Sequence, residues 1–206
     1  AKAQSCAVMM RANQKISHTP PKTWKCWNDV AALAAKKSNL STTGVIKSVD
    51  RYMIDSGSHN QATLGHRRWI LNNALDNIGA GSAGSKYSCL WVIGGKSKQK
   101  KPWAAWPPPG DVPAAAISPY GTSLDTTGWS VQSDTINLKN AKVVITVDGQ
   151  NRPVSQRTLK ANYGSKYAIA WRPDGWETKA GELYEVELQG VSPAIAYDVN
   201  VIDCSF

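Results

Sequence analysis

The sequence of 206 residues lacks the run of roughly 18 to 20 apolar residues that a membrane-spanning helix needs. It also lacks a charged start followed by an apolar stretch, which is the pattern of an export signal. We therefore expect a soluble chain without a membrane span, from which any export signal has already been removed.

Glutamate is absent before Glu177, so chemistry in the first part of the chain can use only aspartate or histidine as a base. All three histidines, His18, His59 and His66, lie in that part. The sequence has neither the H-E-x-x-H motif of zinc proteases nor the G-x-S-x-G motif of α/β-hydrolases. These absences argue against two common classes of hydrolase.

Acidic residues are fewer than basic ones, 15 against 24, which gives a net charge of +9. The excess lies in residues 1–110, which carry 16 bases and four acids, whereas residues 111–206 carry eight bases and eleven acids. The bases are scattered over predicted helices and loops, and no nucleic-acid-binding motif is present. We therefore expect an anionic extracellular partner such as a glycan or cell-wall polymer, and no nucleic acid.

The four cysteines, Cys6, Cys26, Cys89 and Cys204, form no C-x-x-C pair and no tight metal-ligand cluster. An even number without such a cluster predicts two disulfides and a secreted protein. Of the three pairings, we favour Cys6 with Cys26, which are close in sequence, and Cys89 with Cys204, which would tie the chain end to the first domain. The alternative is four buried thiols in a cytosolic protein.

Apolar residues at helical spacing predict three helices, over residues 3–13, 27–37 and 45–54. Two β-rich runs, RRWILNN and SCLWVIGG, flank a glycine-rich segment and predict a hairpin. In such a strand Arg67 and Arg68 would point to opposite faces.

The basic stretch KSKQKK at residues 96–101 and the prolines that follow it predict a domain boundary. Beyond them, alternating apolar runs separated by turn sequences predict a small β-sandwich. We therefore divide the chain into a first domain at 1–101, a proline-rich boundary segment at 102–122 and a β-sandwich at 123–206.

Five segments of the first domain resemble the CAP superfamily in order and spacing. They are SH (17–18), SNL (38–40), DRYMID (50–55), LGHRRWIL (64–71) and IGAG (78–81). This superfamily includes cysteine-rich secretory proteins, antigen 5 and plant pathogenesis-related proteins, and the bacterial form with GHRRWIL is the most similar. The resemblance spans about residues 3–95 and implies a secreted α-β-α sandwich with a central cleft. The fold class is then α+β, with the CAP-like sandwich followed by a small all-β immunoglobulin-like sandwich.

The resemblance places His18 and His66 at the two histidines of the family's cleft, Asp55 at one of its glutamates and Ser38 at the other. It implies a divalent metal site of His18, His66 and Asp55, and Zn²⁺ is the cofactor that these ligands would suit. If the protein is an enzyme, these three residues and Ser38 would be its catalytic residues, because a base oriented by a carboxylate can activate a hydroxyl.

Nine tryptophans against one phenylalanine favour a ligand that stacks on indole rings, such as a sugar. Trp69 and Trp91 are predicted core residues of strands. Trp103 and Trp106, beside prolines, are candidates for ligand binding or for packing between domains. Arg67 is a candidate for binding an anionic group in the cleft.

The leading hypothesis is a secreted CAP-like protein that binds an extracellular or cell-surface glycan, lipid or protein through a His18/His66 cleft. The alternative is a peptidase or other hydrolase that uses the same cleft. CAP proteins usually have a further helix before the segment that begins here at Ala1. We expect the surface it would cover to be covered by Trp103 and Trp106, by the β-sandwich, or by a cleaved N-terminal segment of the precursor.

Overall fold

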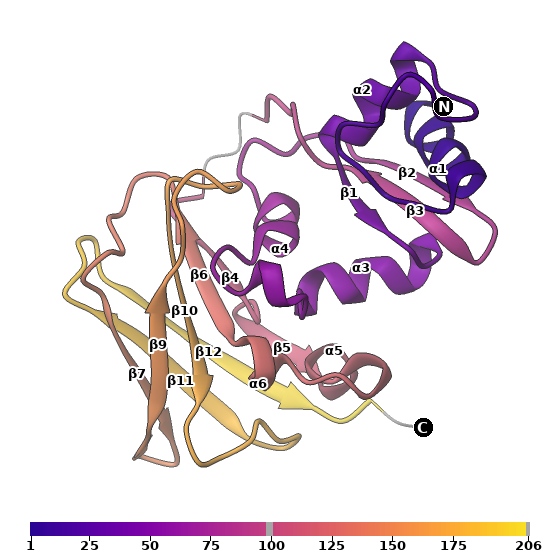
Figure 1. The fold of residues 1–206 in the computed structure, drawn as a ribbon. Helices are drawn as coiled ribbons and strands as arrows, with labels where there is room; N and C mark the ends of the chain where they lie inside the picture. The colour runs from indigo at the N-terminus through magenta and orange to yellow at the C-terminus, as the bar shows by residue number, and fades with distance from the viewer. Residues whose placement is uncertain (98–100, 205–206) are drawn as a thin grey trace. The chain divides into compact units, whose positions relative to one another are not determined.

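The computed structural model describes residues 1–97 and 101–204, and these form two compact units (Figure 1). The N-terminal unit comprises Ala1–Met53 and Asn72–Lys100, and the C-terminal unit comprises Ile54–Leu71 and Lys101–Phe206. The segment 54–71 therefore belongs to the C-terminal unit, although sequence on both sides of it belongs to the N-terminal one. Lys98 and Lys100 of the predicted basic loop lie outside the described residues.

The N-terminal unit is built on an antiparallel sheet with strand order β1-β3-β2. Its elements are α1 (Lys2–Asn13), α2 (Asp29–Lys37), β1 (Ser38–Ser41), α3 (Val45–Ile54), β2 (Gly79–Ala83) and β3 (Lys86–Trp91). The three predicted helices are confirmed. Helix α2 begins two residues later than expected because the side chain of Asn28 accepts a hydrogen bond from the backbone N–H of Ala31 and caps the helix there.

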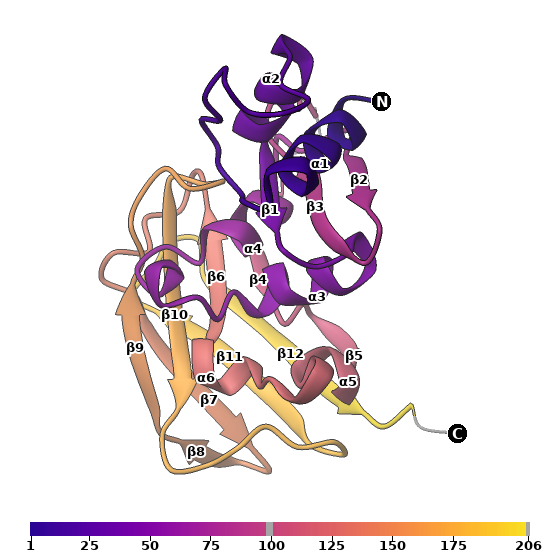
Figure 2. The same cartoon turned by 45° about the vertical axis from the view of Figure 1, so that its right-hand side comes forward.

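Helices α1 and α2 lie on one face of this sheet (Figures 1 and 2). Cys6 of α1 is bonded to Cys89 of β3, so the Cys89 side chain points to that face. Adjacent residues of a strand point to opposite faces, so Ser88 points the other way, where the hydroxyl of Tyr52 from α3 lies near it. The layers of this unit therefore follow the α-β-α order that the resemblance implied.

The cysteine pairing predicted from the sequence is wrong. The disulfide joins Cys6 to Cys89, while Cys26 and Cys204 are exposed free thiols. The physical reason is that α1 packs directly on the sheet and brings two cysteines 83 positions apart to a Cα–Cα distance of 6.2 Å. Gly81 allows this close packing, because a Cβ there would lie 2.3 Å from the backbone of Ala3.

The C-terminal unit is a two-sheet β-sandwich with short helices. One sheet has the order β4-β6-β10-β9 and the other β5-β12-β11-β7-β8. The first consists of β4 (Ala104–Trp106), β6 (Trp129–Ser133), β10 (Tyr167–Pro173) and β9 (Val154–Thr158). The second consists of β5 (Gly110–Pro113), β12 (Ile195–Ile202), β11 (Leu183–Gln189), β7 (Lys142–Val147) and β8 (Gln150–Arg152). The short helices are α4 (Gly65–Ile70), α5 (Ala114–Ile117) and α6 (Leu124–Thr127), with 3₁₀ turns at Ser58–Asn60 and Pro119–Gly121.

Aromatic side chains fill the space between the two sheets. Trp129 and Trp171 from the first sheet are buried, and the Trp129 ring meets the edge of the Tyr184 ring from the second sheet at a centroid distance of 5.4 Å. Burial alternates along β11 with a period of two, as the sequence predicted for this strand. None of the described helices has both the length and the apolar character needed to cross a membrane.

The run RRWILNN was expected to be a strand and is not. Gly65–Ile70 forms helix α4, and the strand that forms a hairpin with β3 is β2, Gly79–Ala83. The helical backbone is favoured here because Asp55 accepts hydrogen bonds from the first turn of α4 and because both arginines of the run find buried acceptors.

Candidate functional site

Asp55 and His66 form a hydrogen-bonded pair within the C-terminal unit. Oδ1 of Asp55 lies 2.8 Å from Nδ1 of His66, and Oδ2 accepts hydrogen bonds from the backbone N–H groups of His66 at 3.0 Å and Arg67 at 3.5 Å. The Asp55 side chain is completely buried, whereas 26% of the His66 side chain is exposed. A buried carboxylate therefore holds a partly accessible imidazole at the first turn of α4.

The bond to Asp55 determines the tautomer of His66. A carboxylate only accepts hydrogen bonds, so Nδ1 must carry the proton and Nε2 carries the lone pair when the ring is neutral. The amide Nδ2 of Asn60 lies 3.2 Å from the same Nδ1. We assign the Nδ1 proton to Asp55, because a carboxylate is the stronger acceptor and a protonated Nδ1 cannot also accept from an amide.

His18 belongs to the N-terminal unit and has the same tautomer for a different reason. Its Nδ1 lies 2.9 Å from the carbonyl oxygen of Ala35 in α2, so Nδ1 donates to that oxygen. The residue is exposed, and Nε2 is again the atom that can accept a proton or a hydrogen bond. Each of the two histidines expected from the resemblance is thus oriented within its own unit.

Arg67 is not a cleft residue, which corrects the expectation that it binds a ligand. It is fully buried within the C-terminal unit. Its guanidinium donates to the carbonyl oxygens of Gly128 and Ile54 and to the hydroxyls of Ser130 and Thr127. Burial lowers its pKa to about 9, a shift that Asp55 opposes, so the group remains protonated at neutral pH. It joins α4 to the sandwich.

Arg68 is buried on the same helix, and the two arginines do not point to opposite faces of a strand. Its guanidinium donates to the carbonyl oxygens of Thr63, Lys160 and Ser165 and to the Ser165 hydroxyl. Burial lowers the pKa of Arg68 to about 10. Both arginines of the GHRRWIL motif therefore fix the position of α4, and with it the position of His66.

The residues do not fit the zinc site that the resemblance implied. Three N–H groups occupy the oxygens of Asp55, so this carboxylate orients His66 instead of presenting a ligand oxygen. Among residues 1–97 and 101–204, no group of three or more His, Cys, Asp or Glu side chains could hold a metal ion. A three-ligand zinc site needs such a group.

Ser38 is buried at the start of β1 in the N-terminal unit. Within the described part of the chain its hydroxyl has no hydrogen-bond partner. A catalytic serine needs a base bonded to its hydroxyl.

Sequence reasoning missed a buried group of hydroxyls around Tyr52 in the N-terminal unit. The side chains of Ser88, Ser48 and Ser41 lie near its phenol. Burial raises the pKa of Tyr52, and these three hydroxyls oppose the rise. Serines spread over one helix and two strands give no sequence signal, so only the fold could reveal this cluster.

Trp103 and Trp106 are half-buried and pack against the core of the C-terminal unit. The Trp103 ring lies 5.2 Å from that of Tyr197. Trp103 also lines a hollow of about 400 Å³ together with Pro102, Pro108 and other residues of the proline-rich segment. One face of this tryptophan thus belongs to the core and another borders a surface hollow.

Residues 1–94 match the CAP family, the cysteine-rich secretory protein family. The match supports a CAP domain over these residues, and it runs through residues 54–71, which the structure groups with the C-terminal unit. No curated protein and no solved structure matches the chain.

Proposed function

We propose that this chain, whose first 94 residues match the CAP family, is a secreted protein that binds a glycan of the cell surface or cell wall through His66. The observation that carries the proposal is the Asp55–His66 pair. Because Asp55 fixes the proton on Nδ1, Nε2 of a partly exposed ring is an acceptor for a ligand hydroxyl. His18, with the same tautomer, is a second acceptor of this kind.

Secretion is supported by the family and by the disulfide. CAP proteins are typically secreted, and the Cys6–Cys89 bond is of the kind that persists in oxidising compartments. The GHRRWIL motif resembles that of bacterial CAP proteins, so the glycans of a bacterial cell wall are the first to test.

The charge of the N-terminal unit, in which His18 lies, favours an anionic glycan as its ligand. The N-terminal unit carries 13 Lys and Arg against three Asp, a net charge of +10, whereas the C-terminal unit has 11 bases and 12 acids. The positive charge of the N-terminal unit attracts anionic polymers over distances of about a Debye length, roughly 8 Å at physiological ionic strength. Binding should therefore weaken as salt is added.

A hydrolase that uses the same histidine is the second candidate, and the Asp55–His66 pair also favours it. In a catalytic triad the carboxylate orients the imidazole and the imidazole activates a hydroxyl. Such a triad also needs a hydroxyl that is hydrogen-bonded to the imidazole. The Ser38 hydroxyl has no hydrogen-bond partner among the described residues, so it does not meet this requirement. We therefore place binding first.

The test compares wild type with His66→Asn and His59→Ala on immobilised cell-wall and extracellular polysaccharides. Asparagine at position 66 can still donate a hydrogen bond to Asp55, so the variant should fold normally. It has no atom in the place of Nε2, so the acceptor for the ligand is lost. His59 is exposed and serves as the matched control. We expect His66→Asn to weaken binding about tenfold, which corresponds to the loss of one hydrogen bond, and His59→Ala to bind like wild type.

Two results would overturn the proposal. If His66→Asn retains wild-type affinity for every polysaccharide that the wild type binds, His66 is not the binding residue. If the wild type releases soluble sugar or peptide fragments and His66→Asn does not, at equal melting temperature, the hydrolase alternative is correct.

A further inference from the structure

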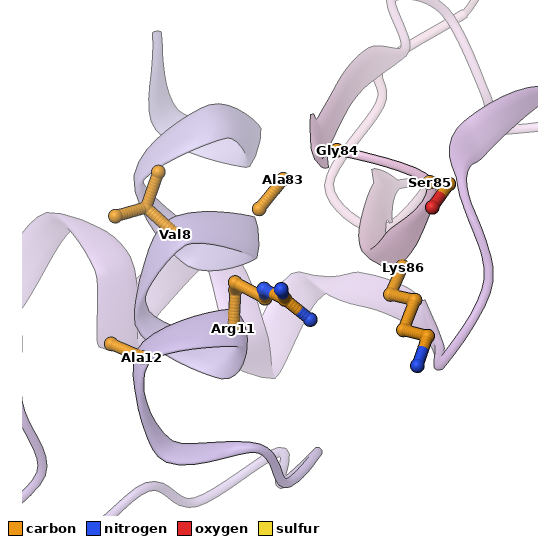
Figure 3. Close-up of a pocket in the computed structure, with 7 residues that line it drawn as sticks. All are labelled: Val8, Arg11, Ala12, Ala83, Gly84, Ser85 and Lys86. Carbon is orange, nitrogen blue, oxygen red and sulfur yellow. The ribbon is translucent and has the colours of Figure 1, made fainter.

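Two hollows lie at opposite ends of strand β3 in the N-terminal unit. The hollow at Lys86, the first residue of the strand, lies between α1 and the turn that joins β2 to β3, and it is lined by two cations and by small or apolar residues (Figure 3). The hollow at Trp91, the last residue of the strand, is lined by an indole ring together with acidic, amide and basic side chains. The hollow at Trp91 therefore combines an aromatic surface with hydrogen-bond donors and acceptors.

The hollow at Trp91 has a volume of about 310 Å³, at the lower end of the range for small-molecule sites, about 300 to 1,000 Å³. Asp76 and Asn77 come from the segment before β2, and residues 94–96 come from the segment after β3. All of these lining residues belong to the N-terminal unit. The hollow is therefore distinct from the Asp55–His66 pair, which belongs to the C-terminal unit.

Backbone contacts hold the two segments that form the walls. The N–H groups of Val92 and Ile93 donate to the carbonyl oxygen of Lys37 at 3.0 and 3.1 Å, which fixes the chain after β3 to the end of α2. Gly95 then packs so closely on the other segment that a Cβ there would lie 2.0 Å from the carbonyl oxygen of Ala74. Walls that are fixed before a ligand binds lose little conformational entropy when it does.

Trp91 provides the aromatic surface of the hollow. The residue is half-buried and packs against the core of the N-terminal unit. The ammonium of Lys2 lies 5.5 Å from the centroid of the ring, so the ring already attracts a positively charged group. The C–H groups of a pyranose ring carry a weaker positive polarisation and are attracted to the same negative face. Because Lys2 is exposed, its flexible side chain can leave the ring when a sugar stacks there.

Three exposed polar side chains, those of Asp76, Asn77 and Lys96, line the same hollow. The carboxylate of Asp76 accepts hydrogen bonds, the amide of Asn77 both donates and accepts, and the ammonium of Lys96 donates. The charges of Asp76 and Lys96 cancel, so the lining residues carry no net charge although the whole unit carries +10. These groups suit a ligand that is neutral and rich in hydroxyls.

We propose that this hollow binds a neutral pyranose sugar, which stacks on Trp91 and donates hydrogen bonds from neighbouring hydroxyls to Asp76. Asn77 and Lys96 bind its remaining oxygens. An acidic sugar would bring its own carboxylate close to that of Asp76, and like charges in contact oppose binding. The proposal does not rest on the proposed function, because it concerns another unit, another class of sugar and no contact with His66.

A titration followed by NMR tests this proposal. The probes are neutral tetrasaccharides of glucose, galactose, mannose and N-acetylglucosamine, with tetragalacturonate as the anionic comparison. At millimolar concentration we expect at least one neutral tetrasaccharide to shift the indole N–H resonance of Trp91 and the backbone resonances of Asn77 and Gly94. Its affinity should not change when salt is added, because the lining residues carry no net charge. The proposal is overturned if no neutral tetrasaccharide shifts these resonances, or if only tetragalacturonate does.

Variants assign the binding to individual side chains, whereas the wild-type spectra do not depend on how any variant folds. Trp91→Ala should bind the tetrasaccharide at least tenfold more weakly, and Asp76→Ala about tenfold more weakly, because each removes a direct contact. Lys2→Ala removes the cation from the ring and should bind at least as tightly as the wild type. If either Trp91→Ala or Asp76→Ala keeps the wild-type affinity, the sugar does not bind in this hollow as proposed.

Trp27→Ala is the matched control for Trp91→Ala. Trp27 is half-buried against the same core, and the ammonium of Lys22 lies 5.5 Å from its ring centroid. It does not line the hollow, so Trp27→Ala should bind the tetrasaccharide like the wild type. Equal losses in the two variants would refute stacking on Trp91. His66→Asn should also bind the tetrasaccharide like the wild type, so failure at this hollow can be told apart from failure of the proposed function.

Discussion

Asp55 reaches across from the end of α3 to His66 at the start of α4, with 2.8 Å between Oδ1 and Nδ1. Asp55 has a left-handed backbone at φ 58°, which is uncommon for a residue other than glycine. This conformation reverses the chain so that the carboxylate can accept from the first N–H groups of α4. One residue therefore ends one helix, caps the next and sets the tautomer of the candidate ligand-binding histidine.

Replacement of Asp55 by asparagine should lower the free energy of unfolding by about 1 to 3 kcal/mol. The amide Nδ2 cannot accept from the N–H groups that now bond to the carboxylate, so at least one buried donor loses its acceptor. Urea unfolding followed by tryptophan fluorescence measures the change, with exposed Asp76→Asn as the control. Identical urea midpoints for Asp55→Asn and wild type would show that the cap contributes nothing.

Arg67→Met should destabilise the protein more, by roughly 3 to 5 kcal/mol, because it leaves several buried oxygens without a donor. Arg51→Met, at an exposed position of α3, is the matched control and should change stability by less than about 0.5 kcal/mol. Thermal unfolding by circular dichroism compares the two. Arg67 would be a surface residue in solution if both variants melted like wild type.

The disulfide gives a prediction about labelling and one about stability. Alkylation without reduction, followed by mass spectrometry, should modify Cys26 and Cys204 and leave Cys6 and Cys89 unmodified. The Cys6→Ser/Cys89→Ser double variant should lose about 4 kcal/mol, as expected for a bond that closes a loop of this length. A label on Cys6 or Cys89 in the native protein would refute the pairing.

Buried tyrosines should make the protein unstable in alkali. An unfolded tyrosine ionises near pH 10.0, whereas burial raises the pKa of Tyr197 well above that value. The folded state keeps the proton that the unfolded state loses, so this contribution is present below pH 10 and is lost as the pH rises. Burial also raises the pKa of Tyr52 and of Tyr184.

Tyr197→Phe tests this directly, because the Tyr197 hydroxyl has no hydrogen-bond partner among the described residues. The variant should have the same free energy of unfolding as the wild type at pH 7. Above pH 10 the free energy of unfolding should fall less steeply in the variant than in the wild type, by about 1.4 kcal/mol for each pH unit. Urea unfolding at a series of pH values measures how steeply the free energy of unfolding changes with pH in each protein. Parallel slopes for the two proteins would show that Tyr197 ionises in the folded state.

The sequence predicted most of the regular elements, because their apolar residues follow the period of a helix or a strand. It failed at α4, where two arginines that look like surface residues are buried against carbonyl oxygens of distant segments. No periodicity encodes such an arrangement. It also failed at the disulfide, because the contact between Cys6 and Cys89 depends on how α1 packs on the sheet.

The candidate site was predicted in part. Asp55 and His66 came from the resemblance and lie together, but neither periodicity nor spacing connects two residues eleven positions apart on different helices.

The most direct measurement is a long-range ¹H–¹⁵N spectrum of the His66 ring, recorded with and without the polysaccharide that the wild type binds most tightly. We expect the proton on Nδ1 in the free protein and a shift of the Nε2 resonance when the polysaccharide is added. A proton on Nε2 in the free protein, or an Nε2 resonance that saturating polysaccharide leaves unchanged, would contradict the role given to the Asp55–His66 pair.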